Sequence, residues 1–217
     1  MRKTLSKQFF FFLIAFLFLG SKAFGGIFLE PYIGYAVGFQ NYTLKSGSVD
    51  QGIKSFATPN GMTVGGRIGL SLGPLYLAGD MSSYVWDGSI PGATPSASAG
   101  KWSFSSMGVT AIFSPPVLPL RVWAGYHFSD KMTQEYGSYS FEKTGTSIKF
   151  GGSLSLIPLG IASITVNAEY IMTTYGDFAL TGSKGSVTIG GDTLTFGDLT
   201  QNTVLITVAL PFDVPFT

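Results

Sequence analysis

The stretch that decides the fold is Leu120-Arg121-Val122-Trp123-Ala124-Gly125-Tyr126-His127-Phe128. Its even positions are all apolar or aromatic, whereas Arg121, Gly125 and His127 fall on odd positions. A period of two residues indicates a β-strand, whose side chains point alternately to its two faces. One face of this strand is therefore apolar, and the other face carries the charge.

Seven further segments alternate in the same way and also predict strands. The least regular is 102–113, where Phe104 and Ile112 fall on the polar face, and we expect a bulge or register change there. The last strand ends with an aromatic residue, either Phe212 or Phe216. The seven segments are 27–39, 62–72, 75–86, 102–113, 146–156, 161–175 and 203–212.

Charge within these segments is confined to the polar face. A soluble protein buries its apolar side chains, so a polar interior inside an apolar surface requires lipid as the surrounding solvent. The pattern predicts an all-β protein, an eight-stranded antiparallel up-and-down transmembrane β-barrel. The six charged residues expected in its lumen are Glu30, Arg67, Asp80, Arg121, Lys149 and Glu169.

The turns predict how these charges pair. A two-residue turn at Gly73-Pro74 places Arg67 directly opposite Asp80, and a three-residue turn from Pro158 to Gly160 places Lys149 opposite Glu169. Glu30 and Arg121 can join the same network, because an eight-stranded barrel is only wide enough for its own side chains. We expect a closed lumen, and the alternative is a gate whose pairs exchange and admit ions.

Residues 1–23 have the features of a secretory signal peptide, with basic residues, an apolar run of eleven residues from Phe9 to Leu19, and small residues at positions 21 and 23. Cleavage leaves one barrel domain at 24–217, with 9 basic and 12 acidic residues. This balance disfavours nucleic-acid binding. The chain has no cysteine, so no disulfide can stabilise the exported barrel.

Connections between the predicted strands alternate in length. Those near residues 73, 116 and 159 are short, whereas 40–61, 87–101, 129–145 and 176–202 are long and polar. Residues 186–196 alternate around Gly190-Gly191-Asp192, which predicts a hairpin that extends the last two strands above the membrane. Outer-membrane barrels have short periplasmic turns and long extracellular loops, so we expect both chain ends on the periplasmic side.

The chain resembles the small outer-membrane β-barrel superfamily of Gram-negative bacteria, which includes the OmpA membrane domain, OmpX and OmpW. The resemblance rests on the aromatic and glycine-rich first strand, Leu29 to Gly38, and on the alternating last strand, Val204 to Phe212. It implies a place in the bacterial outer membrane, contact with its lipid and lipopolysaccharide, and insertion by the barrel-assembly machinery. Members differ in activity, so the fold alone does not give the function.

One motif suggests an enzyme. His127-Phe128-Ser129 resembles the His-aromatic-Ser run of outer-membrane lipid A deacylases, which implies His127 as base and Ser129 as nucleophile, with Glu135 or Glu142 orienting the histidine. Asp130 follows where that family has Asn, and His127 is expected to face the lumen, away from a lipid substrate. A structural role for His127 is therefore favoured over catalysis.

Two non-enzymatic functions are left. A narrow channel for ions or small apolar solutes is suggested by glycine-rich inner faces and by Phe104, Trp123 and Leu205 pointing inward. The favoured reading is a non-enzymatic surface protein that anchors extracellular loops for adhesion or envelope integrity and meets an extracellular ligand through them. We expect no cofactor, and a single histidine argues against a multi-histidine metal site. The aromatic residues assigned to the loops are Tyr42, Phe56, Tyr136, Tyr139 and Phe141.

Overall fold

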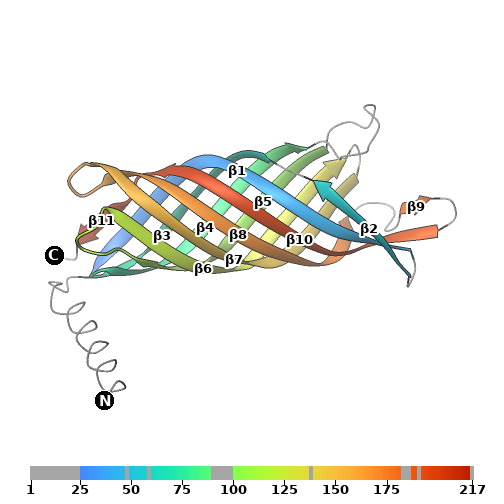
Figure 1. Ribbon diagram of the computed structural model, residues 1–217, viewed down its shortest axis with the longest axis horizontal. Helices are drawn as coiled ribbons and strands as arrows, with labels where there is room; N and C mark the ends of the chain where they lie inside the picture. The colour runs from blue at the N-terminus through green and yellow to red at the C-terminus, as the bar shows by residue number, and fades with distance from the viewer. Residues whose placement is uncertain are drawn as a thin grey trace, which may run out of the picture.

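The computed structural model describes residues 25–46, 49–57, 60–88, 100–136, 139–181, 187–189 and 192–215. Its strands form an eight-stranded antiparallel barrel with three short strands added at the two ends (Figure 1). This confirms the predicted fold class. The wall strands are β1 (Gly26–Ser46), β3 (Asn60–Leu72), β4 (Leu75–Gly88), β5 (Gly100–Phe113), β6 (Leu120–Tyr136), β7 (Tyr139–Pro158), β8 (Ser163–Thr181) and β10 (Asp192–Ala209).

The barrel closes where the first and last wall strands meet. β1 and β10 pair from Tyr32↔Ala209 to Ser46↔Leu194, with one bulge. Below this pairing, the short strand β11 (Phe212–Pro215) takes the place of β10 beside β1. In Figure 1, β11 lies at the left end of the barrel with the short turns, whereas β2 (Val49–Ala57) and β9 (Val187–Ile189) lie at the right end. The right end is hereafter the loop end, and the left the turn end.

The predicted alternation of faces is confirmed. Along β3, Met62, Val64, Ile68 and Leu70 are 51–61% exposed, whereas Thr63 and Arg67 are buried. Apolar side chains on the outer face of a barrel gain no stability in water, but they do so in contact with acyl chains. The apolar outer face of this barrel therefore suits contact with the lipid of a membrane. No helix in the described part of the chain is long and apolar enough to span one.

Three of the predicted long loops are mainly strand. β1 continues to Ser46 and pairs with β2, while β6 and β7 continue until only residues 137–138 lie between them. β8 reaches Thr181, and β10 begins at Asp192, where it pairs with β9 in the hairpin predicted around Gly190-Gly191. The polar composition of these segments did not predict strands, because a strand that extends above the membrane needs no apolar face. The structure does not describe the side chains of the five aromatic residues assigned to the loops.

One of the two predicted pairings is correct in register. Arg67 lies directly opposite Asp80. Lys149 lies opposite Ile171 instead of Glu169, whose direct partner is Gly151. The turn holds four residues instead of three, with Leu159 N donating to Ala162 O at 2.8 Å, and β7 has a bulge between Ser155 and Ile157. The turn shifts the register by three residues and the bulge in β7 restores one, so the net shift is two.

The bulge expected within segment 102–113 occurs instead on the neighbouring strand, β6. Phe104 and Ile112 keep the alternation of β5 and point inward, 2% and 1% exposed. Between these two residues, Met107 pairs with Ser129 and Gly108 with His127 of β6, so Phe128 is the extra residue of a bulge in β6. A bulge changes which face the following residues occupy. Asp130 thereby turns into the lumen, where it is 4% exposed.

The C-terminal strand is interrupted rather than continuous. β10 ends at Ala209, one residue short of Leu210, whose N donates to Pro31 O at 3.0 Å. Phe212 belongs to β11, where it pairs with Leu29 and forms a bridge with Ala162. Phe216 and the predicted signal peptide, 1–23, lie outside the described residues.

Candidate functional site: the filled lumen

The lumen consists of three layers along the barrel axis. A charged layer in the middle lies between two apolar clusters. The cluster at the turn end contains Phe28, Ala78, Ile112 and Trp123, with Tyr76 packed against it. The larger cluster at the loop end contains Ala36, Tyr84, Trp86, Trp102, Phe104, Met132, Ile171, Tyr175, Leu199 and Leu205.

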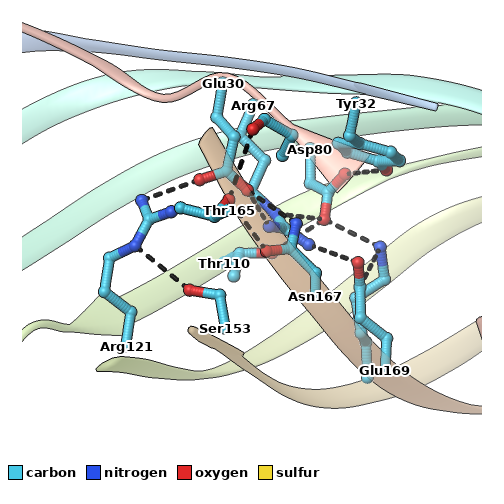
Figure 2. A network of polar contacts seen from close by, with 12 residues as sticks. Glu30, Tyr32, Arg67, Asp80, Thr110, Arg121, Ser153, Thr165, Asn167 and Glu169 are labelled. Atoms are coloured by element: carbon cyan, nitrogen blue, oxygen red, sulfur yellow. Dashed lines mark hydrogen bonds and ion pairs between the residues drawn. The ribbon is translucent and has the colours of Figure 1, made fainter. Parts of the chain in front are cut away.

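Arg67 and Asp80 are the centre of the charged layer (Figure 2). Arg67 contacts three carboxylates, with Nη1 2.5 Å from Glu30, Nε 3.2 Å from Asp80 and Nη2 2.8 Å from Glu169. Its guanidinium also lies 4.4 Å from the centroid of the Trp123 ring. A planar guanidinium supports such multiple contacts because its donors point in several fixed directions. Arg67, which lies on β3, therefore connects this strand with β1, β4 and β8.

Asp80 receives hydrogen bonds from four other strands. Lys149 Nζ donates to Oδ2 at 2.8 Å, and Thr110 donates to the same oxygen at 3.3 Å. Tyr32 Oη donates to Oδ1 at 3.0 Å, and the Arg67 contact completes the set. Asp80 is fully buried, so these donors replace the hydration that its carboxylate loses.

The structure brings all six predicted lumen charges into one network. Lys149 Nζ reaches Glu169 at 3.2 Å although the two residues are not directly opposite, because a long side chain can contact a diagonal neighbour. Arg121 Nη1 lies 2.7 Å from Glu30 Oε2, and its Nε donates to Ser153 at 3.3 Å (Figure 2). Asn167 Nδ2 donates to Glu30 at 3.3 Å.

Sequence reasoning missed two buried charges, Asp130 and Lys143, each 4% exposed. Both fell inside the loop predicted at 129–145. The β6 bulge that turns Asp130 inward leaves no mark in the alternation, and Lys143 lies in the part of β7 that was read as loop. With them, the described lumen holds four acidic and four basic side chains besides His127.

The bulge separates the two residues of the deacylase-like motif. His127 is fully buried in the lumen, whereas Ser129 is exposed on the outer face. Of the two candidate orienting residues, Glu142 contacts Lys131 at 2.8 Å, and the side chain of Glu135 lies outside those described. The hypothesis of a His127–Ser129 pair therefore has no supporting geometry.

His127 instead contacts a different serine. Its Nδ1 shares a hydrogen bond with Ser106 Oγ, and this hydroxyl also bonds to Asp130 Oδ1. The residue types are those of a hydrolytic triad, but the order differs, because the serine lies between the histidine and the carboxylate. All three residues are at most 8% exposed, which keeps substrate away from the hydroxyl. Among the described residues, no cluster of three His, Asp or Glu side chains could hold a metal ion.

Comparisons with known proteins support the fold. No family model and no curated protein matches the chain. Among solved structures, the outer membrane protein AlkL, determined by solid-state NMR in DMPC bilayers, aligns with a TM-score of 0.54 at 13% identity over 91% of this chain and 95% of AlkL. The Yersinia pestis attachment invasion locus protein Ail, in complex with the heparin analogue sucrose octasulfate, aligns with 0.45 at 16% identity over 86% and 99%. Pseudomonas aeruginosa OprG aligns with 0.45 at 11% identity over 88% and 97%.

Proposed function

We propose that this chain is a non-enzymatic protein of the bacterial outer membrane, whose closed barrel holds extracellular hairpins in place for adhesion. In this proposal, the signal peptide directs export and the barrel-assembly machinery inserts the barrel. Lipopolysaccharide in the outer leaflet of the membrane then surrounds the barrel. If the hairpins bind another component of the envelope, the protein contributes to envelope integrity in the same way.

The observation that carries the proposal is the filled lumen. Trp86, Phe104, Tyr175 and Leu205 are all at most 2% exposed at the loop end, and the charged layer below them is equally buried. A conducting pore needs a continuous open path for ions, and in both layers buried side chains fill the bore. The strands nevertheless continue beyond the loop-end layer as paired hairpins, as in β6 and β7. A closed cylinder with extended hairpins suits display better than transport.

The experiment is planar-bilayer recording together with a cell adhesion assay. We expect no single-channel conductance from the purified full-length protein, and surface attachment by cells that express it. Conductance by the wild-type protein would overturn the proposal in favour of the narrow channel. A folded, surface-exposed barrel that promotes neither attachment nor envelope resistance to detergent would also overturn it.

A deacylase assay tests the enzymatic alternative. We expect no release of acyl chains from lipid A, because the Ser106 hydroxyl is buried and Ser129 is separated from His127. Release that disappears in the Ser106→Ala variant would instead identify the buried Ser106–His127–Asp130 cluster as catalytic. A Ser129→Ala variant with unchanged behaviour is the matched control.

A further inference from the structure

The side chains that fill the lumen end at the turn-end apolar cluster, and the mouth of the barrel beyond it is open. A cavity of about 470 Å³, hereafter the vestibule, lies below the turn-end apolar cluster. Its walls come from β4, β6, β7, β8 and β11 and from the turns between them, and the polar residues among them are Tyr76, Ser114, Arg121, Ser155, Ser163 and Asp213. Cavities of this size are typical of small-molecule sites.

Arg121 supplies a positive charge to this cavity. Two of its nitrogens are occupied, Nη1 by Glu30 and Nε by Ser153. Nη2 is buried and has no hydrogen-bond partner. A buried charged donor without a partner is costly, and Nη2 would gain free energy if the Arg121 side chain, which is 11% exposed, turned it toward an acceptor in the cavity.

Asp213 supplies the opposite charge from a different element. Its Oδ2 accepts a hydrogen bond from Tyr76 Oη at 3.2 Å, which holds the carboxylate against β4. Asp213 N donates to Ile161 O at 3.1 Å, and this bond fixes β11 to the β7–β8 turn. The carboxylate therefore has a defined place in the wall of the vestibule.

The two charges together limit which ligand can bind. A simple anion would be repelled by Asp213 and Glu30, and a simple cation would be repelled by Arg121. A ligand with a carboxylate and an ammonium group meets both walls favourably. The space between Arg121 and Asp213 is surrounded by serine hydroxyls and by the apolar side chains of Leu118, Pro119, Ile161 and Pro211. Such a lining suits a ligand whose two charged groups are joined by small uncharged groups.

We propose that the vestibule is a binding site for a small zwitterionic peptide, with its carboxylate on Arg121 and its ammonium on Asp213. The orientation of the proposed function places this site on the periplasmic side, where free oligopeptides and the peptide stems of the cell wall share this chemistry. Binding itself does not depend on that orientation.

The test measures binding of alanyl-alanine to the purified full-length barrel in detergent micelles by titration calorimetry. We expect a Kd of roughly 0.1–1 mM, the range for a ligand with few atoms. N-acetyl-alanyl-alanine lacks the ammonium and should bind at least tenfold more weakly to the wild-type protein. The Asp213→Asn substitution keeps the shape of the side chain but removes its charge, and this variant should bind the two ligands with equal affinity.

The amide of the dipeptide provides the matching comparison for Arg121. It lacks the carboxylate, and we expect at least a tenfold loss of affinity with the wild-type protein. This loss should be absent in Arg121→Gln, whose side chain carries no charge. Because Arg121 also contacts Glu30, this variant is a second line of evidence, and the Asp213 comparison stands if it fails to fold. Lys131→Gln, at the loop end, is the control that should bind like the wild-type protein.

Failure of alanyl-alanine to bind, or an equal loss of both ligands in Asp213→Asn, overturns the vestibule proposal. A second arm separates the two sources of the peptide. Retention of the wild-type barrel, but not Asp213→Asn, on purified cell-wall sacculi identifies wall peptides, whereas calorimetric binding without retention identifies soluble ones. A failed titration leaves the conductance and adhesion results unaffected, so the two proposals fail separately.

Discussion

Asp80 shows how one side chain can determine the state of a whole lumen. It is fully buried and makes contacts with Tyr32, Arg67, Thr110 and Lys149, each from another strand. Buried ion pairs add little net stability when compared with apolar residues of the same volume, but a buried charge left without its partner is strongly destabilising. The network is therefore more sensitive to the loss of one member than to its replacement as a whole.

Asp80→Asn should destabilise the barrel severely. The amide keeps the volume but leaves Arg67 and Lys149 without one of their carboxylates, and we expect a loss of about 3–5 kcal/mol in the free energy of unfolding. Urea titration of the barrel refolded in lipid vesicles measures this. Lys131→Gln removes an exposed pair with Glu142 and should cost less than about 1 kcal/mol. Equal costs for both variants would contradict the role assigned to Asp80.

Asp213 gives the vestibule a pH dependence. It lies in β11, outside the eight membrane-spanning strands, and burial raises the pKa of its carboxyl above the ordinary value, partly opposed by the Tyr76 hydrogen bond and the Arg121 charge, while Glu30 raises it further. An ammonium ligand prefers the ionised carboxylate, so the affinity should be full at neutral pH and fall as the pH drops through that raised pKa. Calorimetry between pH 4 and pH 7 measures it, and Asp213→Asn should give a flat profile.

At the scale of the strand, β3 uses glycine differently on its two faces. Gly69 faces inward, where an added Cβ would lie 2.0 Å from Leu77 O and 2.5 Å from Ala78 Cα, both backbone atoms of β4. Gly66 faces outward, and the nearest atom to an added Cβ is Glu30 O at 3.6 Å, an ordinary contact. The close approach of β3 and β4 beside the Arg67–Asp80 pair therefore requires glycine at position 69 but not at position 66.

Gly69→Ala and Gly66→Ala form a matched pair of variants in this strand. We expect Gly69→Ala to lose about 1–3 kcal/mol, because backbone must move to accept the methyl group. Gly66→Ala should be neutral or slightly stabilising, since it reduces the entropy of the unfolded chain. Unfolding in urea measures both. If the two variants are equally stable, β3 and β4 are further apart than the register implies.

At the scale of the molecule, the barrel and its hairpins are separable in structure. The outermost lumen residue of β6 with a described side chain is Met132, 4% exposed within the loop-end apolar cluster. One residue beyond Met132, Thr133 lies directly opposite Glu142, and from there β6 and β7 continue as a hairpin. The part that contributes to the core therefore ends at Met132, and display can be altered above it.

Replacing residues 134–141 with Asn-Gly tests this separation. This turn connects directly opposed strand positions, so we expect a folded, heat-modifiable barrel within about 1 kcal/mol of the wild-type stability. Adhesion should be lost. Met132→Ala should cost about 2–5 kcal/mol, because it opens a cavity in the loop-end apolar cluster. Unfolding of the trimmed barrel, or full adhesion without the hairpin, would contradict the scaffold function.

The sequence by itself determined the fold class, the faces of the strands and six of the lumen charges. It could do so because side chains of a strand alternate strictly, so a segment such as 62–72 records on its own which face meets lipid and which meets the lumen. A tight two-residue turn also made the Arg67–Asp80 pairing readable, since it fixes the register locally.

Only the tertiary structure decided what depends on an extra residue or on distant strands. The bulge at Phe128 moved Asp130 inward and Ser129 outward, and the four-residue turn displaced Lys149 from Glu169, although the length of the side chain restored their contact. A bulge is stabilised by the partner strand and leaves no periodic trace in its own sequence. The vestibule likewise required Arg121 and Asp213, 92 positions apart in the sequence, to meet at the barrel mouth, and no local pattern encodes that distance.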